Sequence, residues 1–331
     1  MQVLKEDTEA KPDVAVTKTR KLVERDRVDV LVGPVQSGEA LAIRDYVHGQ
    51  TIPLIVPVAG TRDLTAPAKA SAWIFRITET SDQTSFPMGT WVIKNTPYRK
   101  IIVMASDFVG ARHQVEAFMA AFRQGGGQIV KEIYPPLGVP DFAPYLAQVT
   151  GLEADALYAF FAGADAIRFV KTYREYGLGG KLPLLGHSAL VDDNILPAMG
   201  DAALGIQSMG QYSATLDTPE NRAFVRDYEI RYSARPTRYS ETGYVAGQLI
   251  VAAVNALKGE VSDRAKFHDA IRTVVTQIHP PRGPIQFDRY QQVITNQYAM
   301  KVERQGNRLV NAIIDRIPNV SQEDTWKWWN R

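Results

Sequence analysis

Two short loops rich in small residues are the parts of this sequence best suited to bind a ligand. The first, GPVQSG, contains Gln36 and Ser37 immediately before an expected helix. A helix that begins there offers free backbone N–H groups and a serine hydroxyl, which together can hold a carboxylate. Capping of the helix by Ser37 explains the serine equally well, and the two roles are compatible.

The second loop, PVAGT, carries Ala59 and Gly60, whose small side chains let a ligand approach the backbone N–H groups. A plain tight turn explains this loop equally well. Aromatic side chains are available at Phe160 and Phe161, although such a pair more often lies in a core than in a pocket. Carboxylate binding is the chemistry that these residues could perform.

The sequence contains no recognised motif for catalysis, nucleotide binding or metal binding. The dinucleotide loop G-x-G-x-x-G, the phosphate loop G-x-x-x-x-G-K-[ST] and the nucleophile motif G-x-S-x-G do not occur. None of the five histidines is spaced as in H-E-x-x-H or H-x-H. The glycines at 125–127 follow a predicted helix and are a stop signal. We therefore expect no enzyme, no cofactor and no metal.

Alternating strand and helix patterns position the two loops. Residues 28–33 and 53–58 are nearly continuous apolar runs, typical of parallel strands buried on both faces, and residues 39–47 have helical spacing. Strand, helix and strand in this order form a right-handed crossover, so both loops open at one carboxyl edge, where open α/β sheets bind ligands. A second α/β series follows from residue 100, and a further strand is predicted at 2–7.

Length and composition restrict the class of protein. The 331 residues favour about two domains, and 45% hydrophobic and 22% charged residues are ordinary for a soluble globular protein. A net charge of +2 gives no indication of a nucleic-acid or membrane-surface partner. No apolar run approaches the roughly 18–20 residues that span a bilayer. The absence of cysteine excludes disulfides and fits an oxidising compartment as well as the cytoplasm.

Nine segments follow one another along the chain in a characteristic order from residue 2 to about residue 300. They are KLVERDRVDVLVGPVQSG, TIPLIVPVAGTRDLT, WIFRITETSDQ, GGGQIVKEIYPPLGVPDFAPYLAQV, DALYAFFAGADAIRFVKTYREYGL, LPLLGHSAL, ALGIQSMGQYS, PTRYSETGYVAGQLI and PRGPIQFD. In this order they resemble the type I periplasmic solute-binding proteins of ABC importers, of the leucine/isoleucine/valine-binding-like class. Each segment alone is weak evidence for the family, but nine segments in the family's order are highly specific evidence.

The resemblance implies an α/β fold with two similar doubly wound three-layer lobes, which are joined by three crossing strands and close on a ligand. Residues 1–78 and 213–290 would form the N-terminal lobe, and residues 79–212 and 291–331 the C-terminal lobe. It further implies a periplasmic monomer that delivers a small carboxylate to an ABC transporter permease. Such a protein has no nucleic-acid partner and does not insert into the membrane.

The resemblance also assigns the site. Ser37 would hold the ligand carboxylate with backbone donors of the next loop, at Val58 and Gly60. The other lobe would contribute the loop after Asp107, a strand that ends in paired aromatics and glycine, and the G-x-[DE] loop. The predicted ligand-binding residues are Gln36, Ser37, Val58, Ala59, Gly60, Phe108, Val109, Phe161, Gly163, His187, Ser188 and Tyr212.

One departure from the family pattern bears on the ligand. Amino-acid-binding members have a carboxylate in the G-x-[DE] loop for the ligand ammonium, whereas this chain has His187 and Ser188 there. A buried ammonium without that partner would lose several kcal/mol. We therefore predict an acid without an α-amino group. Phe108, Phe161 and Tyr212 favour an aromatic acid, whose ring hydroxyl could bind Ser188 or His187.

Family members begin with a signal peptide, a strand and a helix before the strand equivalent to residues 2–7, and the sequence lacks all three. We expect a shortened N-terminus, which would remove a central strand from the sheet. Alternative functions are binding of a branched-chain or other amino acid, or ligand sensing as a receptor or regulator domain. The weakest alternative is an enzyme, such as a dehydrogenase or hydrolase, which would need a dinucleotide loop or a base–nucleophile pair.

Overall fold

The computed structural model describes residues 1–326. Its contacts divide the chain into two units. Unit 1 comprises Met1–Thr80 and Tyr239–Thr295, and unit 2 comprises Ser81–Arg238 and the residues from Asn296 on. Both units are mixed α/β with parallel strands, which confirms the predicted fold class. Within the described residues, no helix is both long and apolar enough to cross a bilayer.

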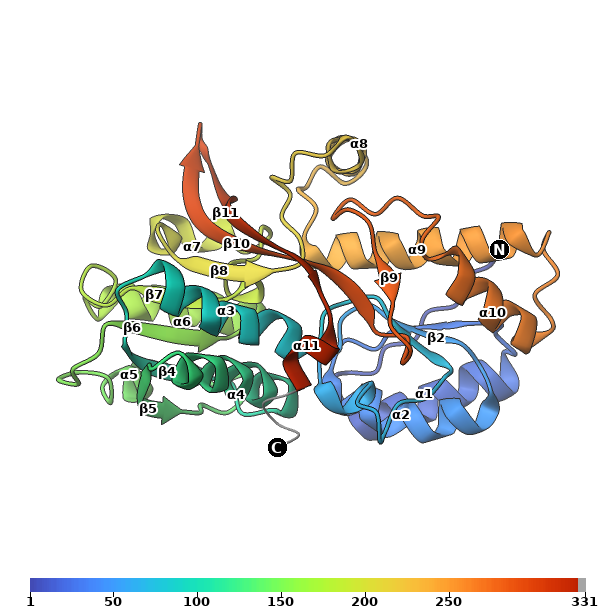
Figure 1. Ribbon diagram of the computed structural model, residues 1–331, viewed down its shortest axis with the longest axis horizontal. Coiled ribbons are helices and arrows are strands. Elements are labelled where there is room, and N and C mark those ends of the chain that lie inside the picture. Colours follow the sequence, from blue (N-terminus) through green and yellow to red (C-terminus); the bar gives the residue numbers. More distant parts are fainter. Residues whose placement is uncertain (327–331) are drawn as a thin grey trace. The chain divides into compact units, whose positions relative to one another are not determined.

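Unit 1 has three short parallel strands with helices on both faces (Figure 1). Its elements are α1 (Pro12–Arg20), the π-helix η1 (Lys21–Arg25), β1 (Leu31–Val32), α2 (Ser37–Gln50), β2 (Leu54–Val56), the 3₁₀-helix η2 (Arg62–Leu64), β3 (Ile74–Arg76), α9 (Arg238–Ala256), α10 (Arg264–Val274) and β9 (Gln286–Phe287). Strand β2 lies between β1 and β3. Leu54 and Val56 pack with residues of α1 and α2, whereas Ile55 packs with residues of α9 and α10. Burial on both faces explains the continuous apolar run.

The strand predicted at residues 2–7 is wrong, because these residues form no regular element. Val3 is 73% exposed, and the segment lies along α1, where the Glu6 carboxylate is 2.8 Å from the Lys18 ammonium. Among the described strands, β1 pairs only with β2. A segment with no neighbouring strand to pair with has no partner for a backbone ladder, whatever its propensity.

Unit 2 contains the larger sheet. Its elements are α3 (Ser81–Asn95), β4 (Lys100–Ala105), α4 (Val109–Gln124), β5 (Gln128–Ile133), α5 (Ala143–Leu146), β6 (Ala156–Phe160), α6 (Gly163–Glu175), β7 (Leu184–His187), the 3₁₀-helix η3 (Ser188–Val191), α7 (Leu196–Met199), the 3₁₀-helix η4 (Gly200–Ala203), β8 (Gln207–Gly210), α8 (Pro219–Tyr232), β10 (Val293–Gln305), β11 (Arg308–Val320) and α11 (Gln322–Trp326). Strand β10 starts in unit 1, where its first residues pair with β9.

The strands of this sheet lie in the order β11-β10-β8-β7-β6-β4-β5. Strands β8, β7, β6, β4 and β5 are parallel, and β10 is antiparallel to β8. Because β5 and β6 lie on opposite sides of β4, the strand order reverses there. The carboxyl edge at such a reversal is the usual ligand site of an open α/β sheet.

Helices cover both faces of the parallel strands in unit 2 (Figure 1). On one face, α6 packs with Phe161 and Phe169 in the core. On the other face, α3 and α4 pack with Phe118 and Tyr158, whose rings are stacked with centroids 3.8 Å apart. The large side chains of β6 therefore alternate between two separate clusters, as the period of a strand requires.

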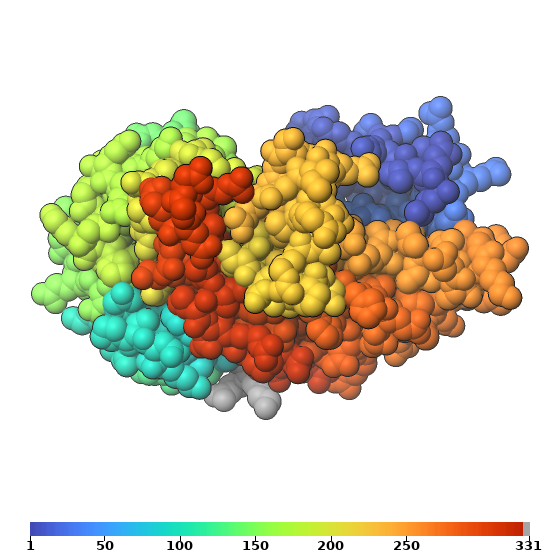
Figure 2. All heavy atoms as spheres, turned by 90° about the horizontal axis from the view of Figure 1, so that it is seen from above, coloured from blue at the N-terminus to red at the C-terminus, as the bar shows by residue number. Residues whose placement is uncertain are grey.

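Residues 213–238 differ from the predicted division of the chain, which placed them in the N-terminal lobe. The structure groups them with unit 2. Phe224 of α8 packs in a cluster with Tyr298 and Met300 of β10, and Glu229 is 3.2 Å from Arg308 of β11. Figure 2 shows α8 and the β10–β11 hairpin side by side on this surface. These contacts with the hairpin determine the assignment.

Candidate functional site

In unit 1, the two predicted ligand loops are joined by a hydrogen bond. The backbone N–H of Thr61 donates to Oγ of Ser37 over 3.2 Å, and Ser37 is 4% exposed. The residue that caps α2 is Gln36, whose N–H donates to the Glu39 carboxylate over 3.0 Å. Ser37 is therefore the first helical residue and not the cap. Since its oxygen accepts from Thr61, its own hydroxyl proton can be donated to another group.

The loop at 58–60 follows β2 and approaches Ser37 through Thr61. Ala59 is buried in the core cluster beneath α2, while Val58 and Gly60 are partly exposed. The first N–H groups of α2 have no partner within the helix, and they carry the positive end of its dipole. The structure thus places a hydroxyl, a helix N-terminus and a small-residue loop together at the carboxyl ends of β1 and β2.

In unit 2, three rings follow three neighbouring strands at their carboxyl ends. Phe108 comes after β4, Phe160 ends β6 and His187 ends β7. The ring centroids of Phe108 and Phe160 are 6.1 Å apart in an edge-to-face arrangement, and those of Phe160 and His187 are 5.3 Å apart. We call this group the aromatic edge. It lies at the reversal of strand order, where a ligand is expected.

The structure does not support the predicted pocket role of Phe161. Its side chain is 1% exposed, and its ring packs in the core against Phe142 and Phe169, with centroids 4.9 and 4.5 Å away. The neighbouring Phe160 was considered with Phe161 but left out of the predicted ligand-binding set, although alternation along the strand could have favoured it. Because Tyr158 and Phe160 share one face and Phe161 the other, only one member of the aromatic pair can join Phe108.

His187 and Ser188 lie at the end of β7 and are both buried. The N–H of Ala189 donates to Nδ1 of His187 over 3.0 Å, so a neutral ring carries its proton on Nε2. Oγ of Ser188 has no hydrogen-bond partner among the described residues. This hydroxyl lies against Gly210 of β8, where an added Cβ would come within 2.2 Å of it. A buried hydroxyl without a partner is a candidate contact for a polar ligand group.

The remaining predicted residues occupy two kinds of position. Val109 and Gly163 are the first residues of α4 and α6, so both lie at helix N-termini on the carboxyl edge. Tyr212 is different, because its hydroxyl donates to Oδ1 of Asn221 over 2.9 Å and its ring packs against Phe224. Tyr212 is thus part of the packing beneath α8, which does not support the predicted ligand contact.

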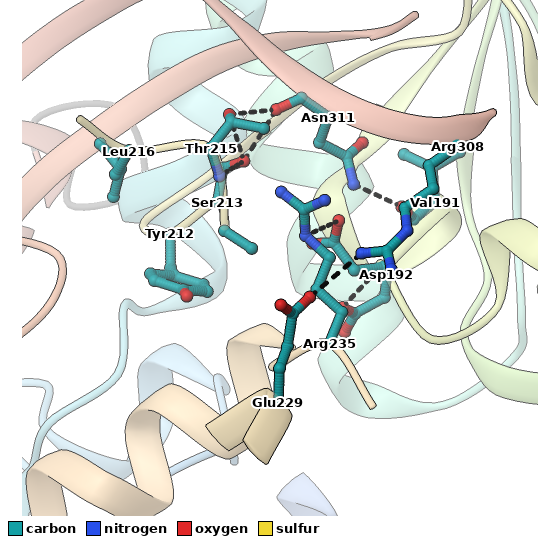
Figure 3. A network of polar contacts seen from close by, with 12 residues as sticks. Val191, Asp192, Tyr212, Ser213, Thr215, Leu216, Glu229, Arg235, Arg308 and Asn311 are labelled. Atoms are coloured by element: carbon teal, nitrogen blue, oxygen red, sulfur yellow. Dashed lines mark hydrogen bonds and ion pairs between the residues drawn. The ribbon is translucent and has the colours of Figure 1, made fainter. Parts of the chain in front are cut away.

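Two adjacent buried acids, Asp192 and Asp193, follow η3 and were not predicted. Figure 3 shows the network around them. Nε of Arg235 is 3.8 Å from Oδ1 of Asp193, and Asn311 donates from Nδ2 to the carbonyl of Val191 over 2.8 Å. Burial and then the neighbouring Asp193 charge raise the pKa of Asp192 to about 7, and burial raises the pKa of Asp193 to about 6. Two consecutive acids in an otherwise apolar stretch were the available signal.

The Asp192–Asp193 network is tied to the segment that enters α8. Hydroxyls of Ser213 and Thr215 both donate to the carbonyl of Asn311 over 2.7 Å (Figure 3). A surface groove of about 680 Å³ lies beyond this segment, and its charged lining includes the ion pair of Asp217 and Arg222. None of the predicted ligand-binding residues lines that groove. In the part of the chain that the structure describes, no group of three or more acidic or histidine side chains could hold a metal.

Three comparisons with known proteins all match this chain to binding proteins of one family. The family model of the periplasmic binding proteins matches residues 1–307. The chain is 28% identical to Leu/Ile/Val-binding protein homolog 6 of Brucella melitensis over 307 residues, which is 91% of this chain and 77% of that protein.

Three solved structures are also similar. The ABC transporter substrate-binding protein from Sphaerobacter thermophilus is 36% identical with a TM-score of 0.90, over 97% of this chain and 88% of that chain. An ABC transporter solute-binding protein from R. palustris, in complex with benzoate, is 31% identical with a TM-score of 0.88, over 95% and 86%. One from Rhodopseudomonas palustris BisB5, in complex with 3,4-dihydroxybenzoic acid, is 30% identical with a TM-score of 0.89, over 97% and 87%. This chain belongs to the periplasmic binding protein family, in its type I, Leu/Ile/Val-binding-protein-like class.

Proposed function

We propose that this protein is the extracytoplasmic solute-binding component of an ABC transporter, and that it delivers a small aromatic carboxylate to a membrane permease. The observation that carries the choice of ligand is the end of β7, where buried Ser188 stands in the place of an acid beside the aromatic edge. Two relatives that are 31% and 30% identical to this chain are in complex with benzoate and 3,4-dihydroxybenzoic acid.

The features of unit 1 suit the carboxylate of such a ligand. Ser37 can donate its hydroxyl proton because its oxygen already accepts from Thr61. The N-terminus of α2 adds N–H donors and a positive potential, and the partly exposed Gly60, which has no side chain, lets a ligand approach its backbone. Hydrogen bonds to a charged group contribute about 1.5–3 kcal/mol each, so two or three donors suffice for a specific anion site.

The features of unit 2 suit an aromatic ring without an ammonium group. Phe108, Phe160 and His187 offer edges and faces that pair with a further ring at about 0.5–1.5 kcal/mol per pair. The nearest acids along the chain, Asp192 and Asp193, are already placed with Arg235 and Asn311. An α-amino group would therefore be buried without a matched charge, which disfavours leucine and related amino acids.

The first test is a titration of the purified protein with benzoate, 4-hydroxybenzoate, 3,4-dihydroxybenzoate and leucine. Calorimetry measures the binding, and thermal unfolding measures the melting temperature with each ligand. We expect the aromatic acids to bind and to raise the melting temperature. Saturation at 100 times Kd stabilises a native state by about 2.7 kcal/mol. Leucine serves as the control and should have no effect. Tighter binding of leucine than of every aromatic acid would contradict the proposed ligand class.

A second prediction concerns the hydroxyl of Ser188. Ser188→Ala should weaken 4-hydroxybenzoate about 5- to 20-fold, because a ring hydroxyl would lose one hydrogen bond, and it should leave benzoate unchanged. The protein itself should be as stable as the wild type or more stable, since this buried hydroxyl has no partner within residues 1–326. Equal losses for both acids would exclude Ser188 as the group that reads the ring hydroxyl.

A further inference from the structure

A fully buried arginine lies behind the small-residue loop of unit 1. Arg76 ends β3 and is 0% exposed. Its Nη1 donates to the carbonyl of Ala59 over 3.2 Å and to the carbonyl of Thr61 over 2.6 Å. Its other guanidinium nitrogens donate to Oγ1 of Thr65 and to Oε1 of Gln292. The Arg76 side chain therefore binds the carbonyl groups of the residues before and after Gly60. It also connects this loop to Gln292, the residue that precedes β10.

These bonds determine the direction in which the loop presents its donors. A trans peptide is planar, and its C=O and N–H point in opposite directions. The only cis bond among the described residues is Gly33–Pro34, so the Ala59–Gly60 peptide is trans. Because the Ala59 carbonyl points at the guanidinium, the N–H of Gly60 points away from it. The cation also polarises this peptide, which makes the Gly60 N–H a stronger donor.

The hydrogen bonds of Arg76 also determine the direction of the Ser37 hydroxyl. The Thr61 residue that gives its carbonyl to Arg76 gives its N–H to Oγ of Ser37, so the position of Thr61 sets the direction of the serine hydroxyl. Gln292 in turn fixes the guanidinium, since its Nε2 donates to the carbonyl of Thr78 over 2.8 Å while its Oε1 accepts from Arg76. A rigid second layer of this kind is what holds binding groups in register.

We propose that Arg76 is a positioning residue for carboxylate recognition, which acts through the Gly60 N–H and the Ser37 hydroxyl without touching the ligand. The inference rests on the proposed function of unit 1 as an anion site. It requires that removal of the Arg76 guanidinium should weaken the binding of a carboxylate ligand far more than the binding of a neutral ligand of the same shape. A merely structural role would weaken both equally or neither.

The test compares Arg76→Lys and Arg76→Met with the wild type, and uses benzoate and benzamide as matched ligands. Arg282→Lys is the control, because Arg282 is equally buried in unit 1 but binds Glu241 and the carbonyl of Ile77. We expect Arg76→Met to weaken benzoate about 10- to 100-fold, Arg76→Lys to show an intermediate loss, and benzamide to change less than threefold. The control should keep its benzoate affinity. An unchanged benzoate affinity in folded Arg76→Lys would overturn the proposal, as would parallel losses for the two ligands.

A measurement without ligand separates this inference from the proposed function. Absence of aromatic-acid binding by the wild type would contradict the proposed function alone. In the ligand-free protein, the Thr61 amide is held by the buried Ser37 oxygen, and we expect Arg76→Lys to accelerate its hydrogen exchange at least tenfold. The amide of Ile55 in β2 should change little and is the internal reference. Unchanged protection of Thr61 in the variant would show that Arg76 does not position the loop.

Discussion

Arg282→Met is expected to lower the free energy of unfolding by about 3–5 kcal/mol, because it leaves a buried carboxylate without its partner. Arg282 and Glu241 are both 0% exposed. Nε of Arg282 donates to Oε1 of Glu241 over 2.8 Å, and a second nitrogen lies 2.7 Å from Oε2. A third donates to the carbonyl of Ile77 over 2.9 Å, so the pair ties α9 to the end of β3. Chemical denaturation followed by circular dichroism measures the loss.

The double variant Glu241→Leu with Arg282→Met is the control for this prediction. It removes both charges together and should recover most of the lost stability, since an apolar pair of similar volume often replaces a buried ion pair at little cost. Burial raises the pKa of Glu241 even in the native protein, where Arg282 opposes the effect. In Arg282→Met alone the loss should therefore be smaller at pH 5 than at pH 8. A single variant as stable as the wild type at pH 8 would contradict the argument.

The second large effect is a decrease of stability with rising pH. Asp192 and Asp193 have pKa values raised to about 7 and about 6, from an ordinary value of 3.8. Between about pH 4 and pH 7 the native state therefore binds more protons than the unfolded state, and the free energy of unfolding falls as pH rises. Arg235 and Arg238 oppose the burial that causes these shifts. At about 1.4 kcal/mol per pKa unit, the two acids together give a decrease of roughly 7 kcal/mol across this window, levelling off above pH 7.

Thermal unfolding at pH 5, 6, 7 and 8 tests this effect, with Asp192→Asn as the matched variant. The amide cannot titrate, so its curve should be flatter and should cross that of the wild type as pH rises. Glu241 contributes a slope of the same sign, which both proteins retain. Glu6, whose pKa Lys18 and Lys21 lower from 4.5 to about 2, acts in the opposite direction between about pH 2 and pH 4.5, below the pH values of this measurement. If stability depended on pH with the same slope in both proteins, Asp192 would not be a cause of the decrease.

Local pattern predicted the α/β fold because its strands and helices are separated by clear signals. The apolar runs near 100–105, 156–160 and 184–187 are strands in the structure, and the family comparison confirms the class. The run at 2–7 had strand propensity too, but a strand also requires a neighbour, which no local window can show. The same limit applies to residues 213–238, whose place depends on contacts with a hairpin about 80 residues further along the chain.

The sequence was sufficient to predict which loops form the candidate site, but it was not sufficient to predict which side chains of those loops take part. Topology alone brings the loop of Ser37 to the loop of Gly60 at one sheet edge, and Phe108 to the end of β6 at another. The choice between Phe160 and Phe161 depends on which face of the strand each side chain occupies. Buried polar groups such as Arg76 and Asp192 were not predicted, since their partners come from distant segments.

The discontinuity of unit 1 has a consequence for the order in which the protein is made. Its sheet comes from the first 80 residues, but α9 and α10, which cover the Ile55 and Phe75 face, belong to the segment after Tyr239. The intervening 158 residues take roughly 8–30 s to synthesise at 5–20 residues per second. At the end of that time β4 to β8 and their helices have been synthesised, while one apolar face of the unit 1 sheet still has no cover. The segment 239–295, which is made after most of unit 2, thus completes the unit that the first segment began.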